Sequence, residues 1–258
     1  MKLQVLLATM NQKNDSVLDR MCVVSDVIVC NQNVDEFSYK TYTKNGKTVD
    51  WYNLNEKGVG LNRNNALMRA TSDICLIADD DVLYHSDYEE IVLSAFERYS
   101  DADMILFNVD EYGYQTRKKM RVRRYNCGRF GGVRIAFRRM SVIKNAVCFN
   151  QLFGGGSMFS AGEDNMFIRD CIRKGLKVYA VPEHILKLDN SRESTWFKGY
   201  NDKFFEDLGS SYCFHYGKMA IIFAFLQLIR HKSLYLQKYT FSDAMKCVVS
   251  GIKKYRLL

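Results

Sequence analysis

The chain has 258 residues, of which 47% are hydrophobic and 26% are charged, and it contains a single proline. This composition predicts a folded protein with one large domain, or one domain with a C-terminal appendage, and it excludes a disordered or low-complexity chain. The formal net charge is +8, and most of it lies in residues 215–258, which carry eight Lys and Arg residues against one Asp.

Strand-like and helix-like segments alternate from the start of the chain. Residues 3–8 and 23–30 have the apolar runs of buried strands, with a short helix between them. Residues 37–52 predict a hairpin, because Asn45 and Gly46 form a turn signal between Tyr- and Thr-rich flanks. This alternation favours an α/β fold with a mostly parallel sheet.

The same alternation continues beyond residue 60, although the second half is less regular. The further predicted elements are helices at 61–70, 88–99 and 163–174 and strands at 74–78, 104–108, 133–137 and 176–181. A glycine-rich loop at 154–156 precedes the third of these helices, and Gly175 ends it. Helical patterns also cover 197–207 and 214 to the last residue.

Three aspartates, Asp79, Asp80 and Asp81, directly follow the predicted strand at 74–78. Carboxylates at the carboxyl end of a buried strand lie where open α/β sheets bind ligands. Alternate residues of an extended segment point the same way, so Asp79 and Asp81 are expected to face one site. Such oxygen ligands suit Mg²⁺ or Mn²⁺, and these ions in turn bind the diphosphate of a nucleotide. The alternative interpretation of the three aspartates is a solvated acidic turn that caps the next helix.

Four motifs occur in a fixed order, namely residues 6–11 after the first strand, 58–66 at the start of a helix, the triple aspartate and 162–164. Together they resemble the inverting family-2 glycosyltransferases of the A-type, Rossmann-like fold, over roughly residues 1–205. The resemblance implies an α/β glycosyltransferase domain with a mostly parallel central sheet.

The resemblance also implies an organisation of the chain. The glycosyltransferase domain is expected at 1–213, with the nucleotide-sugar half at about 1–110 and the acceptor half at about 111–213. A basic, apolar and helical C-terminal extension is expected at 214–258.

The late acidic motif implies a catalytic base. By resemblance, Asp164 deprotonates the acceptor hydroxyl as it attacks the anomeric carbon opposite the departing nucleoside diphosphate, so that the configuration inverts. Glu163 is expected beside it on the acceptor side. Without the other motifs, the ordinary charge of a helix N-terminus would account for both residues.

The donor side is also assigned by resemblance, with Asp79 on the nucleoside and Asp81 on the metal. The expected donor-binding residues are Thr9, Asn11, Arg63, Asp79, Asp80, Trp196 and Lys198. A surface ion pair for Arg63 and a polar strand-end turn for Thr9 and Asn11 are the alternatives that need no ligand.

The second strand ends in Asn31, where many family members have an aspartate that reads the base. The histidine that often completes the metal site is also missing at its usual place, so Asp189 is expected to replace it, with His184 as the alternative. Trp196 and Lys198 lie where a lid is expected to close over the donor and exclude water.

The sequence therefore predicts an enzyme that transfers a sugar from a nucleotide sugar, UDP-type favoured, to a glycan or a lipid-linked saccharide, as in surface polysaccharide assembly, with Mn²⁺ or Mg²⁺ as cofactor. A nucleotidyltransferase is an alternative, although residues 8–12 lack the glycine-rich, lysine-containing loop of that class. A non-catalytic, membrane-associated binding protein is another, although such a protein has no reason to keep Asp79, Asp81 and Asp164 together.

Location and further partners follow from the cysteines, the N-terminus and the basic segments. The eight cysteines form no CxxC pair, and the first strand lacks the pattern of a secretory signal, which favours the cytoplasm. The apolar run at 219–229 is about half the ~20 residues that span a bilayer, so residues 215–258 are expected to lie on a membrane surface or to pack on the domain.

A second basic cluster, at 117–124, is not accompanied by any nucleic-acid-binding motif. No nucleic-acid partner is therefore expected. The phosphates of a lipid-linked acceptor or of a membrane surface are the anions that we consider for this cluster, and a solvated loop is the alternative.

Overall fold

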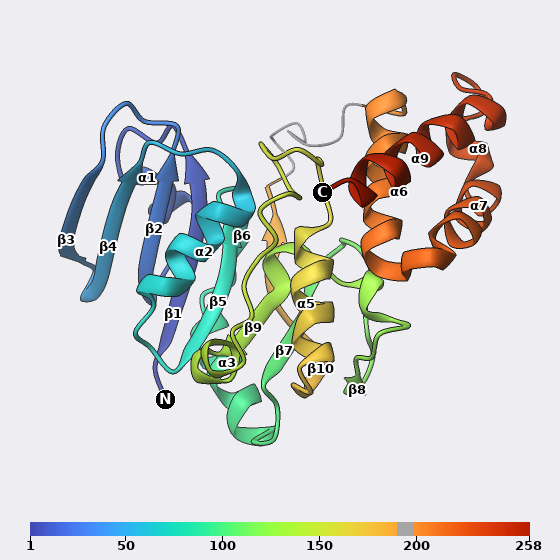
Figure 1. The fold of residues 1–258 in the computed structure, drawn as a ribbon. Coiled ribbons are helices and arrows are strands. Elements are labelled where there is room, and N and C mark those ends of the chain that lie inside the picture. The colour runs from blue at the N-terminus through green and yellow to red at the C-terminus, as the bar shows by residue number, and fades with distance from the viewer. Residues whose placement is uncertain (190–198) are drawn as a thin grey trace. The chain divides into compact units, whose positions relative to one another are not determined.

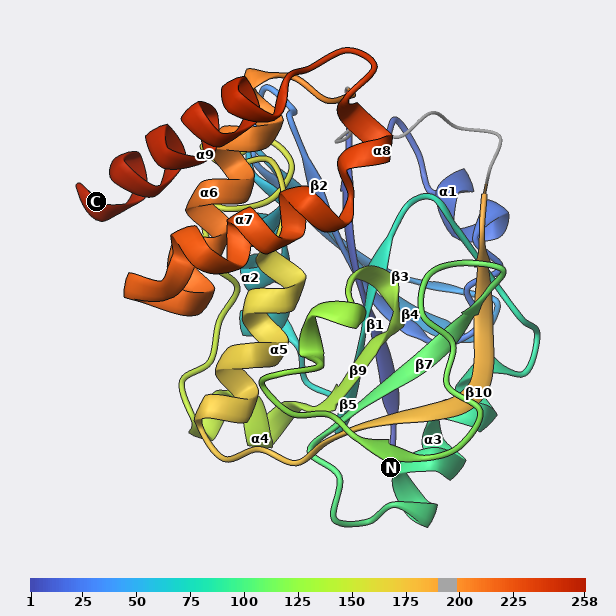
Figure 2. The ribbon, with the colours of Figure 1, turned by 90° about the vertical axis from the view of Figure 1, so that its right-hand side faces the viewer.

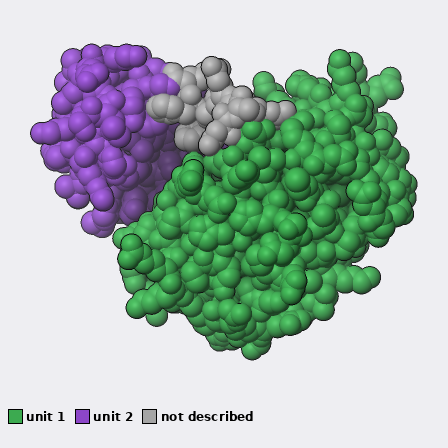
Figure 3. Space-filling view, turned by 180° about the vertical axis from the view of Figure 1, so that it is seen from behind, with its two compact units in different colours: residues 1–151, 163–193 green, residues 152–162, 194–258 purple. Residues whose placement is uncertain are grey.

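The structure is a computed structural model, and it describes residues 1–189 and 199–258. The chain divides into two compact units (Figure 3). Unit 1 comprises residues 1–151 and 163–193, and unit 2 comprises residues 152–162 and 194–258.

Unit 1 is built on one sheet, which has ten strands within the described residues. The strands are β1 (Leu3–Met10), β2 (Asp26–Gln32), β3 (Ser38–Lys44), β4 (Lys47–Leu54), β5 (Ile74–Asp79), β6 (Val82–Tyr84), β7 (Met104–Asp110), β8 (Met120–Arg121), β9 (Ile135–Arg138) and β10 (Val178–Leu188). Their order is β3-β4-β2-β1-β5-β9-β7-β10-β6, and β8 pairs with β10 outside this path.

The centre of the sheet is parallel, as the sequence predicts. Strands β4, β2, β1 and β5 are parallel neighbours, and so are β7 and β10. Strand β9 lies antiparallel between β5 and β7, and the hairpin β3–β4 closes one edge. The parallel strands therefore end at the same edge of the sheet, where β1, β2 and β5 place the polar residues that follow their apolar runs.

The helices of unit 1 are α1 (Ser16–Arg20), α2 (Val59–Arg69), α3 (Tyr88–Arg98), α4 (Arg139–Lys144) and α5 (Glu163–Arg173), with short 3-10 turns η1 (Cys127–Arg129) and η2 (Gly132–Arg134). They cover both faces of the sheet (Figures 1 and 2). Helices α1 and α3 share one hydrophobic cluster with the sheet, and α2, α4 and α5 share a second.

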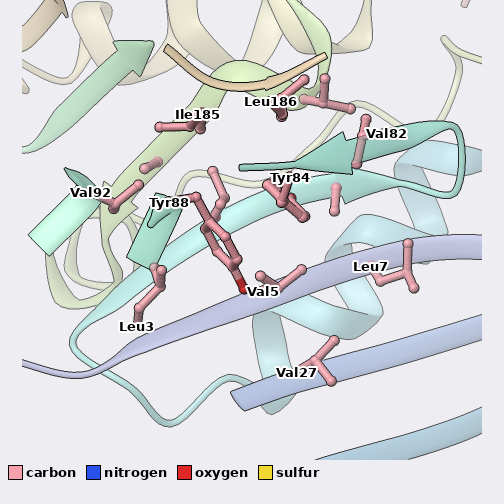
Figure 4. Packing of buried hydrophobic residues seen from close by; sticks show 14 of the residues in the cluster. Leu3, Val5, Leu7, Val27, Val82, Tyr84, Tyr88, Val92, Ile185 and Leu186 are labelled. Atoms are coloured by element: carbon pink, nitrogen blue, oxygen red, sulfur yellow. The ribbon is translucent and has the colours of Figure 1, made fainter. Parts of the chain in front are cut away.

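Strand β1 shows why both faces are covered. Its Val5 and Leu7 belong to the first cluster and Leu6 belongs to the second, as the period of two of a strand requires. Figure 4 shows Val5 and Leu7 in one packed group with Tyr84 of β6 and Tyr88 of α3. A strand with two buried faces needs a continuous apolar run, and this is the pattern that the sequence has here.

Most predicted strand bounds lie within two residues of the observed ones, and three strands differ for reasons that the structure shows. The second strand begins at Asp26 instead of residue 23, because a turn with Cys22 at φ 56° precedes it. Strand β10 continues to Leu188, beyond the predicted end at 181, and it pairs antiparallel with the unpredicted β6. Residues 133–134 belong to the turn η2, so the strand there is limited to β9.

Unit 2 consists of α6 (Asp202–Tyr216), η3 (Gly217–Met219), α7 (Ala220–Arg230), α8 (Lys232–Tyr235) and α9 (Phe241–Arg256), together with the segment 152–162. Helices α6 and α9 approach closely, because a Cβ at Gly209 would overlap the carbonyl oxygen of Val248 and a Cβ at Gly251 would overlap that of Glu206. The expected boundary at 213/214 falls inside α6, so the compact unit begins earlier in the chain than that boundary.

Among the described residues, one helical stretch, Asp202–Arg230, is long and apolar enough to cross a membrane by length and composition alone. The sequence-based expectation considered only residues 219–229 of this stretch. In the structure Gly217 has φ 55° and ends α6, so that α6 and α7 are two separate helices. A buried helix of a soluble protein meets the same criterion of length and composition.

Candidate active site

One buried arginine joins three of the predicted carboxylates. The guanidinium of Arg63, in α2, donates from Nη1 to Glu163 Oε1 at 2.7 Å and to Asp164 Oδ1 at 2.5 Å. Its Nη2 donates to Asp79 Oδ1 at 2.8 Å and Oδ2 at 3.0 Å. The end of β5, the start of α5 and the middle of α2 therefore meet at one guanidinium.

The position of Arg63 is fixed by close packing around α2. Gly60 faces the backbone of Asn150, where a Cβ would overlap the carbonyl oxygen. Asn64 makes a reciprocal pair with Phe149, in which its Nδ2 donates to the carbonyl oxygen at 2.9 Å and its Oδ1 accepts from the backbone N–H at 2.7 Å. The ring of Phe149 lies 5.5 Å from the Arg63 guanidinium carbon. These contacts hold the guanidinium in a site where it is only 2% exposed.

Asp164 has a restricted environment at the N-terminus of α5. Its Oδ1 accepts from Arg63 and its Oδ2 accepts from the backbone N–H of Gly132 at 2.8 Å. Burial raises the pKa of Asp164, and the nearby Glu163 and Asp79 carboxylates raise it further, whereas Arg63 and the Gly132 N–H lower it. The net effect is a pKa of about 7, so this carboxyl exchanges a proton near neutral pH.

Asp80 has other partners than Asp79, but β5 ends at Asp79 and residues 80–81 form a turn, so the alternation expected of an extended segment does not apply here. Its Oδ2 accepts from Thr9 Oγ1 at 2.6 Å and from Gln12 Nε2 at 2.8 Å. Gln12 Nε2 also donates to Thr9 Oγ1 at 2.9 Å. The predicted donor residue Thr9 is thus linked to the triple aspartate, and Gln12 is a member of the site that the sequence reasoning missed.

The loop after β1 is held by asparagines. Asn31, at the end of β2, donates to Asn53 Oδ1 at 2.8 Å and to the Gln12 carbonyl at 3.0 Å, and it accepts from the Gln12 N–H at 2.9 Å. The predicted donor residue Asn11 is exposed, has φ 56°, and accepts from Asn33 Nδ2 at 2.7 Å. Asn31 therefore positions the loop that carries Asn11 and Gln12.

The two residues whose carboxylates are predicted to bind the metal are far apart in the sequence, but their backbones are neighbours in the fold. Asp81 is exposed between β5 and β6, and Asp189 directly follows β10, which pairs with β6. The Asp189 N–H donates to the Asp81 carbonyl at 2.7 Å. Within residues 1–189 and 199–258, no group of three His, Cys, Asp or Glu side chains is placed to hold a metal ion. Two carboxylates suffice when diphosphate oxygens complete the coordination of Mg²⁺ or Mn²⁺, so the donor set fits an ion that binds together with a nucleotide.

The alternative metal ligand, His184, has other partners. Its Nδ1 lies 2.7 Å from Asp110 Oδ1, and its Nε2 lies 3.3 Å from Asn108 Nδ2. The other oxygen of Asp110 lies 2.9 Å from His85 Nε2. His184 therefore belongs to a cluster with Asp110 and His85, on the β7–β10 part of the sheet. The remaining predicted donor residues, Trp196 and Lys198, lie outside the described residues.

Part of the basic cluster at 117–124 contacts aromatic rings of unit 1. The Nζ of Lys119 lies 4.3 Å from the centroid of Tyr99 and 4.0 Å from that of Tyr179, and the Arg121 guanidinium carbon lies 5.0 Å from Tyr179. These contacts attach the strand β8 region to the sheet by cation–π interactions.

The other residues that the sequence reasoning missed act through their backbone or through buried amides. Gly132 contacts Asp164 by its N–H, and Asn62 joins the ends of β1 and β2 by donating to the carbonyls of Thr9 at 3.1 Å and Cys30 at 3.0 Å. A signal for Asn62 existed, since it lies in the motif at 58–66. Gly132 lies in no motif, and nothing local indicates its contact with a residue 32 positions later.

Comparisons with known proteins bear on the family and the fold. The sequence model of glycosyl transferase family 2 matches residues 15–164, more than half of the chain. No curated protein matches the sequence. The crystal structure of S. aureus TarS 1-349 in complex with UDP-GlcNAc has a TM-score of 0.68 at 13% identity, over 99% of this chain and 80% of that one. The mannosyltransferase PcManGT from Pyrobaculum calidifontis, in complex with GDP-Man and Mn²⁺, has a TM-score of 0.51 at 12% identity, over 99% and 75%.

At these identities the solved structures show the fold alone, and the family model shows the family. Both agree with the predicted mixed α/β architecture with a mostly parallel central sheet and C-terminal helices. The matched range 15–164 includes Arg63, the triple aspartate and Asp164. The chain belongs to glycosyl transferase family 2 and has its A-type fold.

Proposed function

We propose that this protein transfers a sugar, with inversion, from a nucleoside-diphosphate sugar to a hydroxyl of a glycan or a lipid-linked saccharide. The donor binds at the ends of β1 and β5, a divalent cation binds between the donor and Asp81, and Asp164 acts as the base. UDP is the favoured nucleotide.

The observation that supports this most is the contact of Arg63 with both Asp79 and Asp164. Asp79 ends the strand at which A-type enzymes bind the donor, and Asp164, the proposed base, lies in the first turn of α5. One buried guanidinium therefore holds a donor-side carboxylate and the proposed base in fixed positions, which is the preorganisation that group transfer requires.

The properties of Asp164 suit a general base. A base that operates near neutral pH is most effective when its pKa lies close to that pH, and burial raises the pKa of Asp164 to about 7. Arg63 and the Gly132 N–H orient the carboxylate from two directions. In the proposed reaction the acceptor oxygen forms a bond to the anomeric carbon, the bond to the diphosphate oxygen breaks, and Asp164 takes the hydroxyl proton. Glu163 shares Arg63 with Asp164 and keeps the base in place.

The charge balance of the site supports a divalent cation. Asp79, Glu163 and Asp164 share a single buried guanidinium, and Asp80 and Asp81 add further carboxylates nearby. A diphosphate is repelled by such a cluster unless a cation binds with it. Asp81 and Asp189 are the side chains that we expect to hold this cation, which would neutralise charge on the departing diphosphate.

Binding of the donor is tested first, by the thermal stability of the protein with UDP, GDP and their sugars, each with and without Mn²⁺. A ligand that binds only the folded state raises the melting temperature. We expect a metal-dependent rise with uridine nucleotides that is lost in Asp81→Asn. The control is Asp87→Asn, an exposed aspartate just before α3 that should leave the rise unchanged.

Catalysis is tested second, with the nucleotide that binds. Release of nucleoside diphosphate from the sugar donor should fall by at least about 1,000-fold in Asp164→Asn, while binding of the nucleotide persists. If no nucleotide shifts the melting temperature with or without Mn²⁺, the proposal of a donor site is wrong. If nucleotides bind but Asp164→Asn keeps full activity, the donor site stands and the assignment of the base is wrong.

A further inference from the structure

Helix α7 of unit 2 carries large apolar side chains on its exposed side. Its Ile221, Ile222, Phe225, Leu226 and Ile229 are each between 41% and 54% exposed. Their spacing of one, three and four residues places them on one face of the helix. Such a contiguous apolar face on a helix marks a surface that contacts something else.

The opposite face of α7 explains this exposure. The side chains that are buried are Ala220, Ala224 and Leu228, which recur every four residues and pack in the core of unit 2. Two of these three are alanines, so the helix offers its small side chains to the core of unit 2 and its large ones to the outside. This is the reverse of the usual pattern of a soluble helix.

A groove on α9 extends the apolar surface. It has a volume of about 700 Å³ and is lined by the apolar Phe241, Met245 and Val249 together with Ser242, Lys246, Ser250 and Lys253. The ring of Phe241 makes an edge contact with Phe225 of α7, at 5.6 Å between centroids. The exposed face of α7 and the groove are therefore continuous, and we call them together the α7–α9 surface.

The charge around this surface is mostly positive, and its acidic exception is Asp243 of α9, which pairs with Lys246. Lys218 precedes α7, Arg230 ends it, and Lys232 and Lys238 follow it, all of them exposed. The sequence between Asp207 and Asp243 contains no acidic residue. An apolar helix face with basic ends is the pattern that binds the boundary between lipid headgroups and acyl chains in anionic membranes.

We infer that the α7–α9 surface binds an anionic lipid bilayer peripherally, with Phe225 and its apolar neighbours in the acyl boundary and the basic side chains at the phosphates. A second copy of the chain is a poorer partner, because two α7–α9 surfaces would bring like charges together. The inference rests on unit 2 alone and does not depend on the proposed sugar transfer.

Sedimentation of the full chain with vesicles tests this inference. We expect binding to phosphatidylcholine vesicles that contain about one third phosphatidylglycerol, and at least about 10-fold weaker binding to phosphatidylcholine alone, because each basic residue near the surface contributes roughly a factor of five. Salt at 1 M, where the screening length is about 3 Å, should release most of the bound protein.

Two pairs of variants separate the apolar and the basic contributions. Ile222→Ser with Leu226→Ser should reduce binding to anionic vesicles by at least about 10-fold. The matched control is Met68→Ser with Tyr125→Ser, two exposed apolar residues of unit 1. Arg230→Gln with Lys232→Gln should weaken binding by roughly 25-fold, and the exposed pair Lys57→Gln with Lys174→Gln should not. Far-UV circular dichroism melts confirm that each variant is folded.

Three results would overturn the inference. Equal binding to neutral and anionic vesicles would exclude the electrostatic contribution, and binding that resists alkaline carbonate would show that the segment inserts across the bilayer. Absence of vesicle binding, combined with a dimer in analytical ultracentrifugation that Ile222→Ser with Leu226→Ser dissociates, would show that the surface binds a second copy instead.

Discussion

Replacement of Arg63 by methionine tests the carboxylate cluster most directly. The substitution keeps an unbranched apolar side chain of similar length but removes the guanidinium that contacts Asp79, Glu163 and Asp164. Removal of one partner from a buried ion pair costs about 3–5 kcal/mol, because the other charge stays buried without compensation. Glu163, at 10% exposed, should account for most of this cost, because Asp164, whose pKa is already about 7, takes up a proton when the guanidinium is lost. Asp79, at 34% exposed, is partly solvated and adds little.

The assay is urea unfolding of Arg63→Met followed by tryptophan fluorescence. In a Trp196→Phe background, Trp51 of β4 is the remaining tryptophan, and it is buried in the core of unit 1. The signal therefore follows the unit that contains Arg63. We expect the free energy of unfolding to fall by about 3–5 kcal/mol at pH 7.5.

Two further variants show whether the carboxylates are the cause. Arg69→Met, in the same helix but half-exposed, should cost about 1 kcal/mol or less. Arg63→Met combined with Glu163→Gln and Asp164→Asn should recover at least half of the loss, because the buried charges are then removed together. A loss for Arg63→Met no larger than that for Arg69→Met would refute the reasoning.

The remaining predictions concern pH, packing and the donor loop. Because burial raises the pKa of Asp164 from 3.8 to about 7, kcat/KM should fall about 10-fold per pH unit below roughly pH 7, whereas a rate that stays flat to about pH 5 would contradict its role as base. The same shift means that the folded state binds more protons than the unfolded state between those two pKa values. The contribution of Asp164 to stability is therefore largest below about pH 4 and is lost as the pH rises through about 7. Asp164→Asn should remove this pH dependence from the free energy of unfolding in urea titrations. Gly60→Ala should lower the free energy of unfolding of unit 1 by about 1–3 kcal/mol in urea. Gly128→Ala, where the added Cβ meets open space, should change this free energy by less than about 1 kcal/mol. Equal effects of the two substitutions would argue against the close approach at Gly60. Thr9→Val loses the hydrogen bond to Asp80 and should weaken UDP binding about 5-fold, as measured by calorimetry. The control is the exposed Thr43→Val, and equal UDP affinity of the two variants would show that Thr9 is not part of the donor site.

The sequence predicts best those features that depend on local pattern. The apolar run of β5 and the helical spacing of α2 are local, and both elements lie within two residues of their predicted positions. The order of the motifs also places Asp79 and Asp164 in one family pattern, and the family is confirmed. That Arg63 joins them depends on the packing of Arg63 against Asp164, 101 positions away, which no local pattern contains.

Short elements and backbone contacts are what the sequence does not indicate. Strand β6 has only three residues, and it exists because β10 extends to meet it. In the sequence nothing distinguishes Gln12 from other polar loop residues. Its contacts with Asn31 and Asp80 arise only because the ends of β1, β2 and β5 meet in the fold. The roles of Asp81 and Asp189 in metal binding stay predictions, and so do those of Trp196 and Lys198.

The segment 152–162 has a consequence for how the protein can be divided. It belongs to unit 2, where the fully buried Phe153 lies 6.2 Å from Phe214 and 5.8 Å from Tyr255 between ring centroids, yet it is covalently inserted between two parts of unit 1. A chain cut after residue 193 would keep this segment and lose the helices that cover it, so Phe153 and Phe159 would face water. Proteolysis or truncation should therefore yield an aggregating fragment instead of an independent catalytic domain, and the functions of the two units are better separated by point substitutions than by deletion.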